Sequence, residues 1–284
     1  MFNTPSSLLN FFIKYNVPMS YFDLPNASPP SAPFIDKSTV YLPPTHRFAN
    51  LAKNLMAYQG MDILPLTQGD NELLQGKVRA KADTLHAQLL QSPPLPDACV
   101  LILITDESVP KLLLTKRASN LSSHAGEVAL VGGKRDDADG SSWGVALREA
   151  HEEVGLSADD TTLIGYLPMQ LSKKGLLVRP VVAAAHADVK DKLRPSEDEI
   201  ADVFWLSLTF LQQNPPVDWV FYRTDIGRRA MNLHTPAWLI KDSKNPDNPN
   251  AHVLWGLTGR ILANLLEIGY GINYPWYYRL KPAD

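Results

Sequence analysis

The feature that most constrains the fold is a change of apolar pattern at Ser-Pro-Pro-Leu-Pro, residues 92–96. Downstream of it, short apolar runs have the length and composition of strands. Cys99–Thr105 and Lys111–Lys116 flank a polar loop and predict a hairpin. The further strand-like runs are Glu127–Val131, Thr161–Leu167, Leu176–Ala185, Ile200–Leu206 and Trp219–Arg223. Helical patterns near Trp143–Val154 and Val253–Ile268 interrupt them, so the sequence predicts an α+β fold in which sheet and helices are layered.

The first 95 residues have a different character. Residues 1–45 hold eight of the 23 prolines, with aromatic residues between them, and predict an extended arm. The arm is expected to pack on its own domain, although it could also join two copies in a homodimer. From Arg47 to Gln91 the pattern is helical, with one apolar face formed by Leu74, Val78, Ala82, Leu85 and Leu89. We therefore expect a Pro-rich arm and helical extension over residues 1–95 and a catalytic domain over residues 96–284.

Composition excludes several classes of protein. The 27 basic and 30 acidic residues give a net charge of −3, so no general affinity for nucleic acid or an acidic membrane is expected. No apolar run approaches the roughly 20 residues that span a bilayer, and the first residues do not read as a signal peptide. The single cysteine, Cys99, lies in an apolar run, which indicates a core residue and excludes an intrachain disulfide. A cytoplasmic protein is expected.

The segment that carries chemistry is Arg148-Glu149-Ala150-His151-Glu152-Glu153-Val154-Gly155-Leu156. A helical period places its three glutamates on one face, next to an apolar stripe of Trp143, Ala146, Leu147, Ala150 and Val154. Glu149 and Glu153 repel each other at i,i+4 by roughly 0.2–0.5 kcal/mol. Glu152 and Glu153 lie at the negative end of the helix dipole, which destabilises the helix by about 0.3–1 kcal/mol for each carboxylate. The cluster is either a solvated acidic face or a site for Mg²⁺ or Mn²⁺, which prefer carboxylate oxygens.

With the preceding Gly132-Gly133, this segment resembles the Nudix box, G-x5-E-x7-R-E-U-x-E-E-x-G-U, where U is aliphatic. The second half matches throughout if Ala150 is accepted as U. The first half is one residue longer, and Asp139 is taken to replace the expected glutamate. The resemblance implies an α/β/α sandwich with a mixed sheet. It also implies metal-dependent hydrolysis of a nucleoside diphosphate linked to another group.

The longer loop and an upstream segment, residues 113–133, are similar to the coenzyme A diphosphatases within the Nudix superfamily. The Leu-Leu-Thr, Ala118, Gly126 and Gly-Gly landmarks are in register, whereas Ser122, Leu130 and Val131 depart from the subgroup. The similarity covers about residues 98–270. It implies cleavage of coenzyme A or acyl-coenzyme A to adenosine 3′,5′-bisphosphate and 4′-phosphopantetheine. The alternatives are hydrolysis of ADP-ribose or dinucleoside polyphosphates, and a non-catalytic module that senses a nucleotide or binds a partner.

The resemblance also implies roles for individual residues. Glu149 and Glu153 would bind the metal with the Gly133 carbonyl, and Glu152 would be a third ligand or the proton acceptor. Arg148 would orient Glu152, and Glu199 would be a further catalytic carboxylate, with Glu197 or Asp202 as alternatives. Three upstream residues could contact phosphate, and these are Lys116, Arg117 and His124. Packing or structural roles are expected for Arg179, Trp255 and Arg260.

Overall fold

The computed structural model describes residues 46–58, 63–64, 77–91, 95–120, 124–172, 175–226, 229–241 and 252–283. The predicted arm lies outside the described residues, as do Leu74 and the side chains of Val78, Ala82, Leu85 and Leu89. In the region expected to be helical, the structure contains α2 (Ala49–Leu55) and α3 (Lys77–Gln91), with single 3-10 turns at His46–Phe48 and Met56–Tyr58.

The main sheet has eight strands built around β1 (Ala98–Asp106), which lies parallel to β7 (Leu177–His186). The other edge of β1 is shared by two antiparallel strands, β2 (Lys111–Arg117) at one end and β4 (Val131–Lys134) at the other. The outer strands are β3 (Val128–Ala129) and β8 (Ile200–Ser207), which pair with β2, and β5 (Thr161–Tyr166) and β6 (Gln170–Leu171), which pair with β7. The sheet is therefore mixed, and the β1–β2 hairpin is confirmed.

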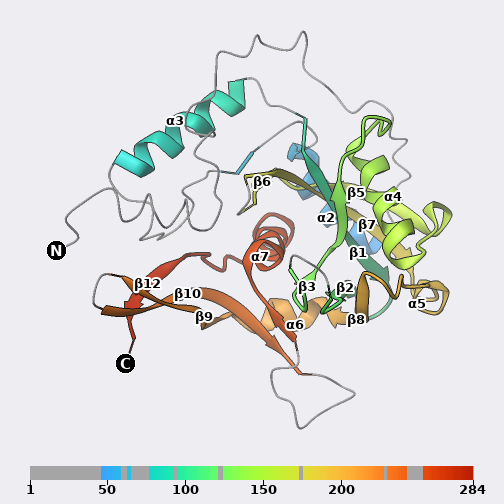
Figure 1. Cartoon of the computed structure of the whole chain (residues 1–284). Coiled ribbons are helices and arrows are strands. Elements are labelled where there is room, and N and C mark those ends of the chain that lie inside the picture. Colours follow the sequence, from blue (N-terminus) through green and yellow to red (C-terminus); the bar gives the residue numbers. More distant parts are fainter. Residues whose placement is uncertain are drawn as a thin grey trace.

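Helices cover both faces of this sheet (Figure 1). Cys99, Leu101 and Leu103 of β1 pack with α4 (Ser142–Val154) on one face. Ile102 and Ile104 pack with α7 (Gly256–Tyr270) and α2 on the other. Because side chains of a strand alternate between faces, β1 is buried on both. This arrangement is the predicted α/β/α sandwich.

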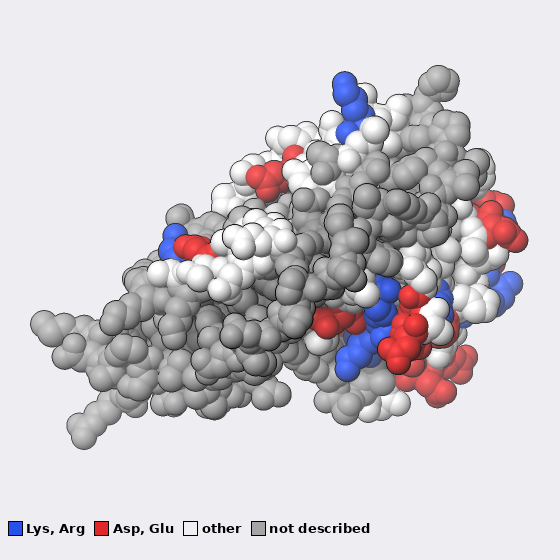
Figure 2. Space-filling view, turned by 90° about the horizontal axis from the view of Figure 1, so that it is seen from above, with Lys and Arg blue, Asp and Glu red and all other residues white. Residues whose placement is uncertain are grey.

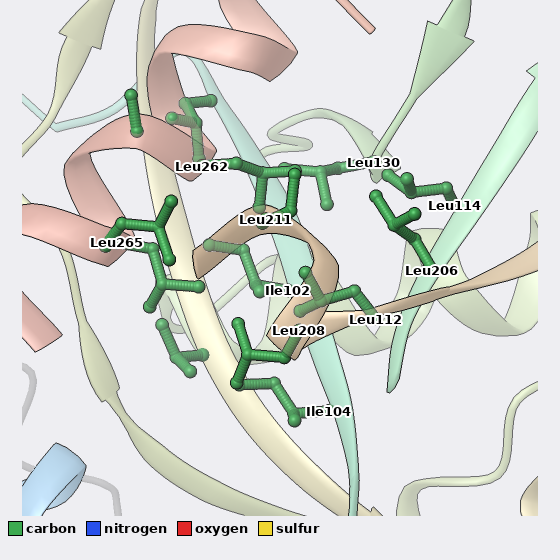
Figure 3. Close-up of a cluster of buried hydrophobic side chains, with 14 of the residues drawn as sticks. Ile102, Ile104, Leu112, Leu114, Leu130, Leu206, Leu208, Leu211, Leu262 and Leu265 are labelled. Atoms are coloured by element: carbon green, nitrogen blue, oxygen red, sulfur yellow. The ribbon is translucent and has the colours of Figure 1, made fainter. Parts of the chain in front are cut away.

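The core on the α7 face is the larger of the two and joins elements that are distant in sequence (Figure 3). Leu262 and Leu265 of α7 lie over Ile102, and Leu208 and Leu211 come from α6 (Leu208–Gln213). Phe48, Leu51 and Leu55 belong to the same core, so residues upstream of the predicted domain start help to build it.

A second sheet has four strands, of which only part of one was predicted. A long hairpin of β9 (Val217–Ile226) and β10 (Arg229–Ile240) carries β11 (His252–Leu254) and β12 (Arg279–Pro282) on β10. The expected helix near residue 253 is wrong at its start, because His252–Leu254 is a strand and α7 begins at Gly256. The expected strand over residues 127–131 is also divided, because Leu130 separates β3 from β4.

The short elements are α5 (Val189–Lys192) and a 3-10 turn at Ala158–Asp160. Within the described ranges, no helix combines the length and the apolar character needed to cross a membrane.

Candidate active site

The helix α4 carries the acidic segment and has well-defined ends. At its start, the Ser141 hydroxyl accepts a hydrogen bond from the Gly144 amide at 3.0 Å. At its end, Gly155 takes the left-handed conformation with φ of 67°, which favours glycine. Two residues of the helix differ from the predicted apolar stripe. Val145, which was not part of it, is fully buried, and Leu147, which was, is half-buried. The stripe therefore lies about one residue away from the expected position.

The last turn of α4 is held by the loop that leads into β8. The Arg194 amide donates to the Val154 carbonyl at 2.7 Å, and the Ser196 amide donates to the Glu153 carbonyl at 2.9 Å. The same loop brings Glu199 back to β2, where its carbonyl accepts from the Ala118 amide at 2.8 Å. These backbone contacts were not predicted, because main-chain hydrogen bonds of a loop leave no residue-type signal in a sequence.

Glu153 is buried, with 5% of its surface exposed. Its carboxylate accepts a hydrogen bond from the Gly132 amide at 3.1 Å and lies 3.5 Å from Nη1 of Arg117. Burial raises the pKa of this carboxyl to about 7, and the negative charges of Glu149 and Glu199 act in the same direction. Glu153 and Glu199 are therefore close enough to interact, although the Glu199 side chain is exposed.

Glu149 lies against the glycine pair. A methyl group added at Gly133 would stand 2.4–2.6 Å from the Glu149 carboxylate, so an alanine there would displace this carboxylate from its present position. Burial raises the pKa of Glu149, while the adjacent Arg148 guanidinium, 3.0 Å away, opposes the shift. Gly133 and Glu149 are thus neighbours in the fold.

Arg148 connects the helix to the preceding loop. Its Nε and Nη2 donate to the two carboxylate oxygens of Asp139 at 3.2 and 3.0 Å, and this pairing lowers the pKa of Asp139. Nη1 donates to Glu152 at 3.0 Å, and Nη2 also donates to the Lys134 carbonyl at 2.8 Å. Arg135 holds the same loop by donating to the Asp139 carbonyl at 3.2 Å. Arg148 therefore contacts Glu152, as the sequence led us to expect.

The three upstream basic residues have different neighbours. Arg117 reaches the acidic cluster through Glu153. Lys116 is half-buried on β2, in register with Asp202 of β8. His124 is exposed, has a positive φ of 57°, and its Nδ1 lies 2.8 Å from the Glu127 carboxylate.

The residues expected to be structural have interior or packing contacts. Arg179 is buried, donates to the Tyr58 carbonyl at 2.6 Å and lies over the Tyr166 ring. Cys99 is fully buried, and burial raises the pKa of its thiol to about 11. Trp255 precedes α7 and contacts the Phe221 ring, with centroids 4.6 Å apart.

The acidic side chains have the donor chemistry of a divalent metal site, but their present arrangement does not surround an ion. Within the described part of the chain, no three His, Cys, Asp or Glu side chains are grouped to hold a metal. Nη1 of Arg148 lies 3.0 Å from carboxylate oxygens of both Glu149 and Glu152. A dication would relieve the repulsion and burial that raise the pKa of Glu149 and Glu153.

Comparisons with known proteins identify a related group. The NUDIX domain family model matches residues 95–224. The chain is 38% identical over 173 residues to an uncharacterized Nudix hydrolase, NudL, from Cronobacter sakazakii, covering 61% of this chain and 82% of the relative. It is also 38% identical over 176 residues to NudL of Escherichia coli K12, with the same coverage.

Two solved structures show weaker likeness. The Nudix hydrolase RenU of Mycobacterium smegmatis is 24% identical with a TM-score of 0.34, covering 41% of this chain and 73% of that one. The NUDIX domain of Shewanella oneidensis NrtR, solved with ADP-ribose, is 20% identical with a TM-score of 0.33, covering 45% and 87%.

Proposed function

We propose that this chain, which belongs to the Nudix hydrolases, has coenzyme A or acyl-coenzyme A as its substrate. Nudix hydrolases act on nucleoside diphosphate-linked substrates and use divalent metal ions. The products would be adenosine 3′,5′-bisphosphate and (acyl-)4′-phosphopantetheine. The observation that carries the catalytic part is the buried carboxylate of Glu153 beside Glu149 and the glycine pair. The choice of coenzyme A is supported by the resemblance of residues 113–133 to the coenzyme A diphosphatases.

The proposed metal ligands are Glu149, Glu153 and the Gly133 carbonyl, with Glu152 as a third carboxylate or as the proton acceptor. When bound, Mg²⁺ or Mn²⁺ would neutralise phosphate oxygens and lower the pKa of a coordinated water. Arg148 is a positioning residue, because it holds Glu152 and Asp139 at the same time.

In the reaction, a water oxygen attacks one phosphorus of the diphosphate and the bond from that phosphorus to the bridging oxygen breaks. The proton lost by the water goes to Glu152, the proposed base, with Glu199 as the other carboxylate near the cluster. The bridging oxygen leaves with the second phosphate. Arg117, Lys116 and His124 are proposed to bind phosphate oxygens, and of these Arg117 is placed beside the acidic cluster.

Product analysis tests the proposal directly. Purified protein with Mg²⁺ is incubated with coenzyme A, ADP-ribose and diadenosine polyphosphates, and the products are separated and identified. We expect coenzyme A to be cut to the two products named above. Cleavage of another substrate with coenzyme A left intact would overturn the substrate assignment, and no cleavage at all would favour a binding module.

Variants test the catalytic roles. Glu152→Gln and Glu153→Gln should each lower Mg²⁺-dependent turnover roughly a hundredfold or more, because each removes a carboxylate from the reacting centre. Glu267→Gln, at the far end of α7, is the matched control and should retain the parent rate. Equal turnover in all the proteins would remove the catalytic assignment.

A further inference from the structure

The start of α7 presents an arginine whose charge has no acidic partner in the described structure. Nε of Arg260 donates to Oε1 of Gln170 at 2.9 Å, and Nη2 donates to the Leu171 carbonyl oxygen. Both acceptors are neutral, and among the described residues no carboxylate forms an ion pair with this guanidinium. Burial accordingly lowers the pKa of Arg260. A buried cation without a compensating anion is an unusual and costly arrangement.

Gln170 adds a second unmet donor at the same place. Its side chain is 1% exposed, and its Nε2 is buried with no hydrogen-bond acceptor among the described residues. The amide nitrogen and oxygen share one carbon, so Nε2 lies beside the oxygen that receives Arg260. The cluster therefore holds a positive charge and an unused N–H donor, a combination that a bound anion would satisfy.

The sheet register locates this cluster relative to the acidic site. Gln170 of β6 is paired with Val178 of β7, Val178 with Ala98 of β1, and Ala98 with Lys134 of β4. Three steps between neighbouring strands correspond to roughly 14 Å. Lys134 directly follows Gly133, which contacts Glu149. This separation, about the length of one nucleotide, is between the backbones of Gln170 and Lys134 along a single row of the sheet. The helix α7, which carries Arg260, and the helix α4, which carries Glu149, cover opposite faces of that sheet. Arg260 as a whole residue is partly exposed, while its guanidinium lies deep enough for burial to dominate its surroundings.

We propose that Arg260 and Gln170 form a subsite for a phosphate monoester of the substrate, separate from the diphosphate on which α4 acts. A guanidinium presents several donors in a plane and pairs with two phosphate oxygens, and the Gln170 amide supplies a donor to a third. The identity of the ligand rests on the proposed function, because coenzyme A carries such a monoester at the 3′ position of its ribose. The subsite would favour coenzyme A over analogues that lack that phosphate.

The first experiment compares kcat/KM for coenzyme A and 3′-dephospho-coenzyme A. The parent should prefer coenzyme A, and Arg260→Gln should lower that preference about tenfold, as expected for the loss of a charged hydrogen-bonding partner. Gln170→Glu should lower it as well, since the new carboxylate would pair with Arg260 in place of the ligand. Arg223→Gln removes the same charge from an exposed position on β9 and should keep the parent preference. An unchanged preference in both subsite variants would overturn the proposal.

A second experiment separates this proposal from the proposed function. With divalent metal removed by a chelator, the melting temperature is compared in phosphate and in chloride at equal ionic strength. A bound anion stabilises the folded state, so phosphate should raise the melting temperature of the parent more than that of Arg260→Gln or Gln170→Glu. Equal increases in all three would mean that phosphate binds elsewhere and would overturn the subsite. If the parent cleaves neither coenzyme, the proposed function fails, and this measurement still decides the subsite.

Discussion

The two glycines before α4 differ in what their missing side chains allow. At Gly133 an added methyl group would meet only the end of the Glu149 side chain, which can move. At Gly132 it would meet the Cys99 carbonyl at 2.3 Å and Val100 Cα at 2.6 Å, where φ is +147°. Gly133 therefore leaves room for the Glu149 carboxylate, and Gly132 allows β4 to pair closely with β1.

We predict that Gly133→Ala lowers turnover by about tenfold or more while changing the free energy of unfolding little, because it displaces Glu149 and not the backbone. Gly132→Ala should instead lower the free energy of unfolding by about 2 kcal/mol or more, since the added methyl group would prevent β4 from approaching β1 as closely. Steady-state kinetics and urea unfolding of both variants check this. A Gly133→Ala enzyme with parental turnover would show that the contact with Glu149 does not matter for catalysis.

Glu153 gives a prediction about pH. Its pKa is about 7 in the folded protein and near the ordinary 4.5 in the unfolded chain. The folded state therefore binds the proton more tightly, and this stabilising contribution is complete below about pH 4.5 and lost as the pH rises through about 7. Without metal, Glu153→Gln should unfold less readily than the parent at about pH 8, by up to roughly 3 kcal/mol. Near pH 5 the difference should be small.

Urea unfolding with a chelator present, at both pH values, provides the measurement. The same pH dependence in parent and variant would contradict the raised pKa. Paired with the expected loss of turnover, a more stable Glu153→Gln protein would show that the carboxylate serves the reaction at the expense of the fold.

At the scale of single elements, α4 depends on its first residue. The Ser141 hydroxyl caps the helix, so Ser141→Ala should lower the free energy of unfolding by about 1 kcal/mol. Turnover at a temperature well below melting should stay near the parent value, because the glutamates lie at the opposite end of the helix. Thermal unfolding and kinetics on one preparation test both parts. A large loss of turnover with unchanged stability would mean that the cap also positions the site.

The sequence predicted those elements whose pattern is local. The helix over residues 143–154 and the strands that correspond to β1, β2, β5, β7 and β8 follow from apolar periodicity, and the structure confirms them. β10 was missed because it contains Pro236 and mixes polar with apolar residues, and only its pairing with β9 makes it a strand. Leu130 was assigned to one strand because the break there arises from a change of partner, from β2 to β1.

The candidate site shows the same difference between features set by local sequence pattern and features set by tertiary contacts. The helix spacing placed Glu149, Glu152 and Glu153 at one edge, whereas the hydrogen bond that Glu153 accepts comes from Gly132, 21 residues earlier. The pairing of Arg148 with Asp139 crosses a loop whose shape has no periodic signal. The roles proposed for Lys116, His124 and Glu199 stay predictions, since their neighbours are set by tertiary contacts.

For the whole molecule, the packing of α2 in the core should contribute measurably to the free energy of unfolding. Leu55 is fully buried and lies against Gly165 of β5, so Leu55→Ala should lower the free energy of unfolding by about 2–5 kcal/mol. Lys53→Ala, on the exposed side of α2, is the control and should change it by less than about 0.5 kcal/mol. Chemical denaturation of the full chain measures both. Similar values for the two would mean that residues 46–58 are dispensable for the domain.

Charges on the described surface are mixed in sign. Figure 2 shows acidic and basic side chains next to each other on the face seen there. Around α4 the same mixing takes the form of named ion pairs, because Arg148 lies within 4 Å of Asp136, Asp139, Glu149 and Glu152.

The ion pairs between Arg148 and these carboxylates mean that the protein carries its own internal counterion. In the structure the guanidinium offsets the negative charge of this edge of the helix. A divalent ion bound at the proposed site would compete with that arginine for Glu149 and Glu152, so its binding should depend on the free concentration of the ion. Arg148 would thus set the ion concentration at which the proposed metal site fills.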